Sequence, residues 1–294
     1  MAVYDLDGQI LQSVLNLDGD AVSTAFDLDG NAVHNSSGVR LKLMSYNVGQ
    51  WYTGSNRPVP TEQKQAYYDL QSEIMLRHRP DILCIQEYLN TWCADGSLAV
   101  NDFLNPYFDT IELTNPNSGY IGHAICSNGI QIRNYTSHNF TTNKGNYPTF
   151  ESCEILVGRK VITLINTHND YTVSYQTQEV TDLLSFIDSL DGGSFILCGD
   201  FNNEDSEKIT TSDHYNNCVR RFLDAGYRVG NGAFDWVKTY YGVVAASING
   251  DYSDSVVCSQ DIIIERIYAD TTKLTDDIGD KTDHLPFIAE MIVN

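Results

Sequence analysis

The chain has 294 residues, of which 42% are apolar and 19% charged, and its formal net charge is −21. These values are typical of a globular protein that buries a sizeable core in one large domain or two small ones. The negative charge argues against a protein that coats nucleic acid by counterion release. An acidic site can nevertheless hold a cation that meets a phosphate. No run approaches the roughly 18 apolar residues that a membrane helix needs.

Residues 4–36 repeat a unit of eleven residues three times, as YDLDGQILQSV, LNLDGDAVSTA and FDLDGNAVHNS. The Asp-Gly pair between short apolar runs favours strand–turn units over a helical supercoil. A calcium loop is the alternative, but positions that an EF-hand fills with ligands hold residues such as Val3 and Ala25. We therefore interpret residues 1–38 as an acidic module for attachment or oligomerisation, joined to a domain over 39–294.

These short repeats resemble the N-terminal arms of some phage particle proteins. The start, MAVYDLDGQI, has neither a basic nor an apolar signal region, so we expect no secretory signal. The expected location is the cytoplasm or a phage particle. Several of the seven cysteines lie in apolar strand-like runs, and no CxxC pair suggests zinc, so reduced and buried thiols are expected.

From Val39 onward, apolar patterning alternates between strands and helices. It predicts a strand over 41–48 and a helix over 61–79 that Pro80 stops. Further strands are predicted over 81–86, 121–127 and 130–135. A hairpin that turns at Gly158-Arg159 is predicted to join 151–158 to 160–168.

The remaining pattern predicts helices over 177–190 and 214–227, with strands over 195–198, 256–265 and 285–293. Strands and helices interleave without a strict βαβ order. The predicted fold class is therefore α/β or α+β, built on mixed sheets. No linker divides residues 39–294.

Polar residues recur next to these predicted strands. Each alone has an ordinary explanation as a turn residue, a first exposed position or a packed core histidine. Their joint identity and order are more specific than any one of them alone. In chain order they are Asn47, Glu87, His168, Asp200, Asn202, Asp261, Asp283 and His284.

The order of these residues resembles the endonuclease/exonuclease/phosphatase superfamily, which includes deoxyribonuclease I, exonuclease III and neutral sphingomyelinases. The resemblance spans about residues 42–291 and implies a deoxyribonuclease I-like, four-layer sandwich of two mixed β-sheets flanked by helices. The matching motifs are Ser-x-Asn (45–47), Gln-Glu (86–87), Gly-x-Ala-Ile-x-Ser (122–127), Thr-His (167–168), Gly-Asp-Phe-Asn (199–202), a strand-borne Asp (261) and Thr-Asp-His (282–284).

The resemblance also implies a reaction, the hydrolysis of a phosphodiester by water. Glu87 would bind the metal, with Asn47 adjacent and Asp283 supporting the same ion or a second one. The implied ion is Mg²⁺, for which Mn²⁺ would substitute. Asp200 would orient and deprotonate the attacking water, and Asn202 would hold the water or the phosphoryl group.

Histidines complete the implied site. His168 and His284 would bracket the phosphate, and Asp261 would orient His284 and fix its tautomer. His123 lies inside the Gly-x-Ala-Ile strand, where it is either a phosphate contact or a packed strand histidine.

Nucleic acid is the expected substrate because much of the superfamily cuts DNA or RNA. Aromatic residues near the motifs, among them Trp51 and Trp236, would stack on bases. The same residues would also suit a membrane interface or a core. A sphingomyelinase-like or phosphoinositide-type lipid phosphoesterase is therefore the first alternative, and an inactive particle or scaffold protein that retains the fold is the second.

Overall fold

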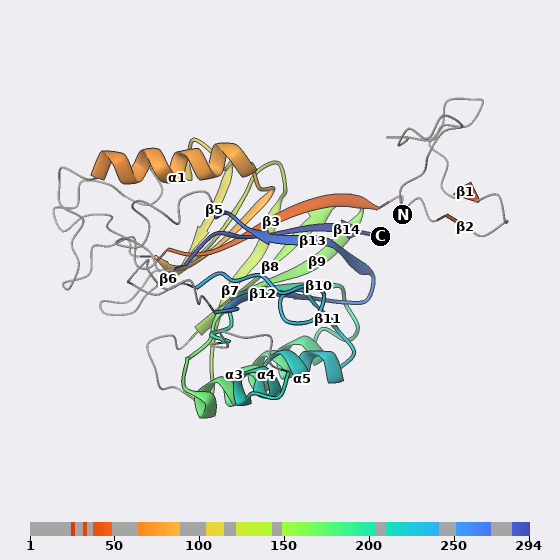
Figure 1. Cartoon of the computed structure of the whole chain (residues 1–294). Coiled ribbons are helices and arrows are strands. Elements are labelled where there is room, and N and C mark those ends of the chain that lie inside the picture. The colour runs from red at the N-terminus through yellow and green to blue at the C-terminus, as the bar shows by residue number, and fades with distance from the viewer. Residues whose placement is uncertain are drawn as a thin grey trace.

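The computed structural model describes most of the predicted phosphoesterase domain and two short pieces of the segment before it (Figure 1). None of the described helices has the length and apolar character that crossing a membrane requires. The described residues are 25–26, 32–33, 38–48, 64–88, 104–114, 122–142, 149–203, 210–240, 251–271 and 284–294.

Two six-stranded mixed sheets form the centre of the molecule. The first has the strand order β13 (Ile262–Ala269), β14 (Phe287–Val293), β3 (Val39–Asn47), β4 (Ile82–Tyr88), β6 (Gly122–Ser127) and β5 (Thr110–Leu113). The second has the order β11 (Arg228–Val229), β12 (Asp254–Cys258), β10 (Phe195–Asp200), β9 (Lys160–His168), β8 (Thr149–Val157) and β7 (Ile132–Asn139). Within them, β3 pairs in parallel with β4, and β9 with β10.

Helices cover the outer face of each sheet (Figure 1). Helix α1 (Lys64–His78) covers the first sheet, and α3 (Val173–Asp188), α4 (Asp213–Asn217) and α5 (Val219–Asp224) cover the second. Alternation along β3 supplies two of these layers at once, because Leu41 and Leu43 enter one apolar cluster while Met44 and Tyr46 pack with Ile74 of α1 in another. The predicted four-layer sandwich of two mixed β-sheets flanked by helices is confirmed.

Several predicted elements are confirmed, and two need correction. The hairpin at Gly158 is confirmed, since β8 and β9 pair antiparallel and Gly158 has φ 63°. The helix predicted over 214–227 is two short helices, because Cys218 has φ −116° and ψ −83° and interrupts them. The strand predicted over 256–265 is also two strands, β12 and β13, which belong to different sheets.

The cysteines of the described residues are free and buried, as predicted. In the N-terminal segment, β1 (Ala25–Phe26) pairs antiparallel with β2 (Ala32–Val33), and the third Asp-Gly pair of the repeat lies between them in the sequence. The other repeat units lie outside the described residues, so the strand–turn interpretation of the whole segment stays a prediction.

Candidate active site

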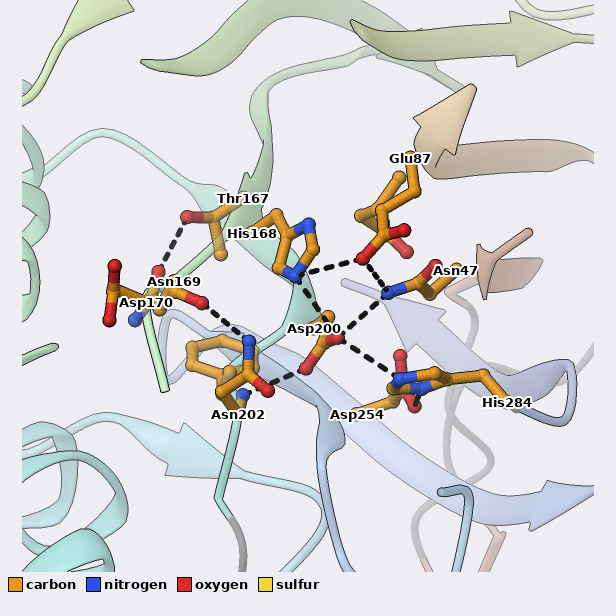
Figure 2. A network of polar contacts seen from close by, with 12 residues as sticks. Asn47, Glu87, Thr167, His168, Asn169, Asp170, Asp200, Asn202, Asp254 and His284 are labelled. Atoms are coloured by element: carbon orange, nitrogen blue, oxygen red, sulfur yellow. Dashed lines mark hydrogen bonds and ion pairs between the residues drawn. The ribbon is translucent and has the colours of Figure 1, made fainter. Parts of the chain in front are cut away.

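The site lies at one edge of the sandwich, where strands of both sheets deliver polar residues (Figure 2). The parallel strands end there, at Asn47 in the first sheet and at His168 and Asp200 in the second. Asp200 is the register partner of His168, so these two side chains are set side by side by the ladder itself. Antiparallel neighbours begin at the same edge, which is why Asp254, the first residue of β12, pairs with Asp200.

A buried amide bridge joins the two sheets next to this edge. Gln86 of β4 donates from Nε2 to Oδ1 of Asn166 in β9, at 2.7 Å. Asn166 in turn donates from Nδ2 to the carbonyl oxygens of Ile85 and Ala124, at 2.9 and 3.1 Å. Because these buried groups satisfy one another, they fix how the two halves of the site face each other.

Asp200 lies at the centre of the contacts (Figure 2). Its Oδ2 accepts a hydrogen bond from Nδ2 of Asn47 at 2.9 Å and lies 3.3 Å from Nε2 of both His168 and His284. Burial raises the pKa of Asp200 to about 7, and nearby Asp254 adds to the rise, while His284 and Asn47 oppose it. A carboxyl group with a pKa near neutrality is suited to proton transfer.

His284 is oriented by Asp254. Its Nδ1 lies 2.9 Å from Oδ2 of Asp254, and both side chains are buried. With Nδ1 engaged, Nε2 is the ring nitrogen that faces Asp200. This pairing is the histidine–carboxylate arrangement expected for His284, made with a different aspartate.

Asp261 was the predicted orienter of His284, and that prediction is wrong. Its carboxylate accepts hydrogen bonds from Lys160 Nζ at 2.7 Å and from the hydroxyls of Ser194 and Ser259. Partial burial opposes the effect, but these donors hold the pKa of Asp261 below its usual value. The physical reason is strand direction, because Asp261 follows the far end of β12 whereas Asp254 begins it.

Glu87 supplies a carboxylate at the more open side of the site. Its Oε1 accepts from Nδ2 of Asn47 at 3.3 Å and lies 3.7 Å from Nε2 of His168. Its side chain is 15% exposed, compared with 1% for those of His168 and Asp200. Glu87 has φ 58°, at a register shift between β4 and β6, and a non-glycine residue in this region is strained. This backbone conformation interrupts the pairing of β4 with β6 and directs the Glu87 carboxylate toward Asn47.

Asn202 braces Asp200 through its backbone. Its amide N–H donates to Oδ1 of Asp200 at 2.8 Å, and its side-chain Nδ2 donates to the carbonyl oxygen of Asn169 at 2.5 Å. Gln176 of α3 donates to the carbonyl oxygens of Phe201 and Asn202 and holds the turn from the helix side. The predicted contact of Asn202 with water or phosphate stays a prediction.

His168 is buried, and its pKa is lowered well below the usual histidine value. Burial is the main cause, and the neighbouring His123 and His284 add to it. His123 is also buried, and its ring centroid lies 6.4 Å from that of His168. Its Nδ1 contacts Oε2 of Glu151, a buried residue of β8 that the sequence did not single out.

Of three other predicted residues, one is placed away from the site and two lie outside the described residues. Trp236 packs on Tyr215 and Tyr252, with ring centroids 6.0 and 5.0 Å apart, beside the core cluster of α3 and α5. Asp283 and Trp51 lie outside the described residues. Their predicted roles in metal and substrate binding stay predictions.

The donor atoms present fit a divalent cation. Asn47 and Glu87 bring an amide and a carboxylate together beside Asp200, and such oxygen donors are the ligands that Mg²⁺ prefers. A second set consists of Asp200, Asp254 and His284, from each of which one ligand atom lies within 4.8 Å of the others. Because Asp254 and His284 already pair with each other, the more open Asn47–Glu87 side fits Mg²⁺ better.

No protein-family model and no curated protein matches the sequence. Solved structures do match. An endonuclease/exonuclease/phosphatase family protein from Bacteroides thetaiotaomicron has a TM-score of 0.62 and 14% identity, covering 87% of this chain and 99% of that one. The chain has the endonuclease/exonuclease/phosphatase fold.

Two further structures of this fold match equally well. TDP2 of D. rerio in complex with a single-strand DNA product has a TM-score of 0.64 and 12% identity, with 86% of this chain and 98% of that one covered. The human Nocturnin catalytic domain with a bound sulfate anion has a TM-score of 0.62 and 16% identity, with 87% and 95% covered. The resemblance predicted from the motifs is thus confirmed at the level of the endonuclease/exonuclease/phosphatase fold.

Proposed function

We propose that the protein is a divalent-metal-dependent phosphodiester hydrolase whose reaction centre is Asp200. The observation that carries the proposal is the position of this carboxylate, buried within 3.3 Å of His168, His284 and Asn47. A single carboxylate shared by two histidines and an amide suits a reaction that moves a proton next to a developing negative charge.

In this proposal Asp200 takes a proton from the attacking water. The buried position keeps its pKa close to neutral, so the carboxylate can accept a proton and release it again. Asn202 holds the Asp200 carboxylate from its other oxygen, which limits the directions in which Oδ2 can point. Water is thereby oriented before it reacts.

His168 and His284 bracket the phosphate from opposite strands. Each presents Nε2 toward Asp200, and the contact of Asp254 with Nδ1 of His284 keeps that ring in place. Nε2 of His168 and Nε2 of His284 would each donate a hydrogen bond to a phosphate oxygen that gains charge in the transition state.

Glu87 and Asn47 would hold the cation, with Asp283 as a further ligand, and Mg²⁺ or Mn²⁺ are the ions proposed. A divalent cation bound there would offset the charge of the phosphate and polarise the P–O bond. Glu87 would contribute the carboxylate, and the strained backbone at this residue keeps it turned toward Asn47.

We propose nucleic acid as the substrate class and expect single strands to be cleaved faster than duplexes. The TDP2 structure of the same fold holds a single-strand DNA product. Here, the ring of Tyr240 lies 5.0 Å from the ring of His284, and an aromatic side chain at this position would stack on a base next to the phosphate site. The net charge of −21 disfavours tight binding of a duplex, in which both strands carry negatively charged phosphates.

We also propose that residues 39–294 form the catalytic domain and that 1–38 serve attachment or oligomerisation. Every described residue assigned to the reaction lies at or beyond Asn47. The acidic segment is therefore assigned no part in the chemistry.

A substrate panel in Mg²⁺ tests the proposed function. It compares single-stranded DNA, supercoiled DNA, RNA, sphingomyelin vesicles, phosphoinositides and an aryl phosphodiester, with Asp200→Asn as the inactive control. We expect the wild type to cleave nucleic acid and the aryl ester, and single strands faster than duplex. Cleavage of lipid alone would overturn the nucleic-acid assignment, and no turnover of any ester would favour an inactive scaffold protein.

A further inference from the structure

A second histidine–carboxylate pair lies beside the site. His123 is the second residue of β6 in the first sheet, and its Nδ1 contacts Oε2 of Glu151 in β8 of the second. The two side chains are 1% and 0% exposed. The other oxygen of Glu151, Oε1, accepts hydrogen bonds from the hydroxyls of Ser137 and Thr149, so the carboxylate has a fixed orientation.

The pair resembles His284 and Asp254 in where its members come from. In both, the histidine lies just before or near the start of a strand of the first sheet and the carboxylate comes from the second sheet. In both, the carboxylate contacts Nδ1. For His284 this leaves Nε2 to face Asp200, and for His123 it leaves a buried Nε2 that makes no hydrogen bond to any described residue.

His123 lies next to the residues assigned to phosphate binding. Its ring is inclined at 59° to that of His168, at the centroid distance of 6.4 Å given above. The Asn166–Ala124 hydrogen bond holds β6 against β9 immediately beside both histidines. Both Thr114 N and Thr114 Oγ1 donate to the carbonyl oxygen of His123, which fixes its backbone.

A buried ring nitrogen without a partner is costly, and a ligand that supplies the missing partner removes that cost. An imidazolium paired with a carboxylate carries a donor on each ring nitrogen. The group that fits the second donor is an acceptor with negative charge, such as a phosphate oxygen.

We propose that His123, oriented by Glu151, is a further substrate-binding residue, whose Nε2 donates a hydrogen bond to an anionic oxygen of the phosphate ester on the His168 side. The inference rests on the proposed function, because the phosphate that His123 would contact is the one that His168 and His284 bracket. Glu151 is the positioning residue of this pair.

Two substitutions separate substrate binding from packing. In His123→Asn the amide nitrogen takes the place of Nδ1, so the contact with Glu151 is kept and the donor toward the ligand is lost. In His123→Gln the amide nitrogen takes the place of Nε2, so the outcome is reversed. His138→Asn is the matched control, since His138 is a strand histidine whose Nε2 pairs with Ser152 and whose ring stacks on Phe150.

The measurement is the affinity for inorganic phosphate in the presence of Mg²⁺, by titration calorimetry, with thermal unfolding of each variant alongside. We expect His123→Asn to weaken phosphate binding by about 10- to 100-fold, because a charge-assisted hydrogen bond is lost. His138→Asn should bind as tightly as the wild type, and His123→Gln, which keeps the donor but loses the contact with Glu151, should bind more tightly than His123→Asn.

Other outcomes overturn the inference in distinguishable ways. Wild-type affinity in His123→Asn, with reduced stability in His123→Gln, would show that the histidine only packs. A wild type that binds no phosphate would contradict the proposed function and this inference together. If both variants fail to fold, histidine ring ¹H–¹⁵N spectra of the wild type decide, because phosphate should shift the Nε2 signal of His123 and not that of His138. An unmoved His123 signal overturns the inference.

Discussion

Asp254 acts on the site through the contact of its Oδ2 with Nδ1 of His284. Asp254→Asn replaces an acceptor that carries charge with a neutral amide, which weakens the hold on the ring and favours the wrong tautomer. We expect the rate of phosphodiester hydrolysis to fall by about 10²-fold or more while the protein stays folded.

Asp261→Asn is the control for that experiment. Asp261 pairs with Lys160 and two serine hydroxyls away from the site, so its loss should leave the rate close to that of the wild type. A slow Asp261→Asn variant together with a fast Asp254→Asn variant would show that the assignment of the two aspartates is reversed.

The roles of single residues were predictable from the sequence where the residue belongs to a motif. They were less predictable where a role depends on which residues two paired strands bring together. Asp200, His168, His284, Asn47 and Glu87 were all singled out and lie together. Asp254 was missed because it lies two residues before Val256, where the predicted strand began. The usable signal was that a strand antiparallel to β10 must begin at the edge of the sheet where β10 ends.

At the scale of elements, the site depends on how closely β9 and β10 approach. Gly199 has φ 148°, and a Cβ there would lie 1.9 Å from the carbonyl oxygen of Thr167, the residue before His168. Gly199→Ala must therefore push the two strands apart and separate His168 from Asp200. We expect a loss of more than about 3 kcal/mol in unfolding free energy by urea titration, and a slower hydrolysis rate.

Gly192→Ala serves as the matched control, because Gly192 also has positive φ but nothing lies within 4 Å of an added Cβ. It should cost only the backbone strain of about 1–2 kcal/mol and leave hydrolysis unchanged. Equal losses for the two variants would mean that the close approach of β9 and β10 is not what Gly199 provides.

Helix α3 carries a buried carboxyl group outside the reaction centre, Glu179. Burial raises its pKa from 4.5 to about 8, while the N–H of Asp170, which donates to Oε2, opposes the rise. Below pH 4.5 the group is protonated in both states. As the pH rises from there to 8, the unfolded chain releases a proton that the folded protein keeps, so the free energy of unfolding falls, by at most about 1.4 kcal/mol per pH unit.

Glu179→Gln removes this titration and keeps an oxygen that can accept from Asp170. Its unfolding free energy should therefore depend less on pH between 5 and 8 than that of the wild type, as measured by urea unfolding at several pH values. Parallel pH curves for the two proteins would show that Glu179 is ionised in the folded state.

The elements themselves were largely predictable, and the exceptions have a local cause. Runs of apolar residues were enough to place β3, β9, β10 and β14, because both faces of these strands reach apolar clusters. Within the run 256–265 the chain leaves one sheet for the other at Ser259, Gln260 and Asp261. This short polar interruption between two apolar stretches was the sign of the break, and it was interpreted as part of one strand. The interruption at Cys218 is a backbone change within a continuous helical pattern.

At the scale of the whole molecule, we expect that the acidic segment can be removed without changing the site. Removal of residues 1–37 leaves Gly38 in place, where an added Cβ would lie 2.6 Å from the carbonyl oxygen of Val293, and thus keeps the start of β3 packed on the end of β14. We expect unchanged hydrolysis rates from the truncated protein, measured beside the full chain. A folded but inactive truncation would show that the repeats belong to the site.

Metal-dependent hydrolysis centred on Asp200 is tested most directly by a rate measurement. The rate of cleavage of an aryl phosphodiester is followed for the wild type and for Asp200→Asn in Mg²⁺, in excess chelator, and after Mg²⁺ is restored. We expect a wild-type rate that vanishes with chelator and returns with Mg²⁺, and a folded Asp200→Asn protein slower by about 10³-fold. Full activity in chelator, or normal cleavage by Asp200→Asn, would contradict the proposed mechanism.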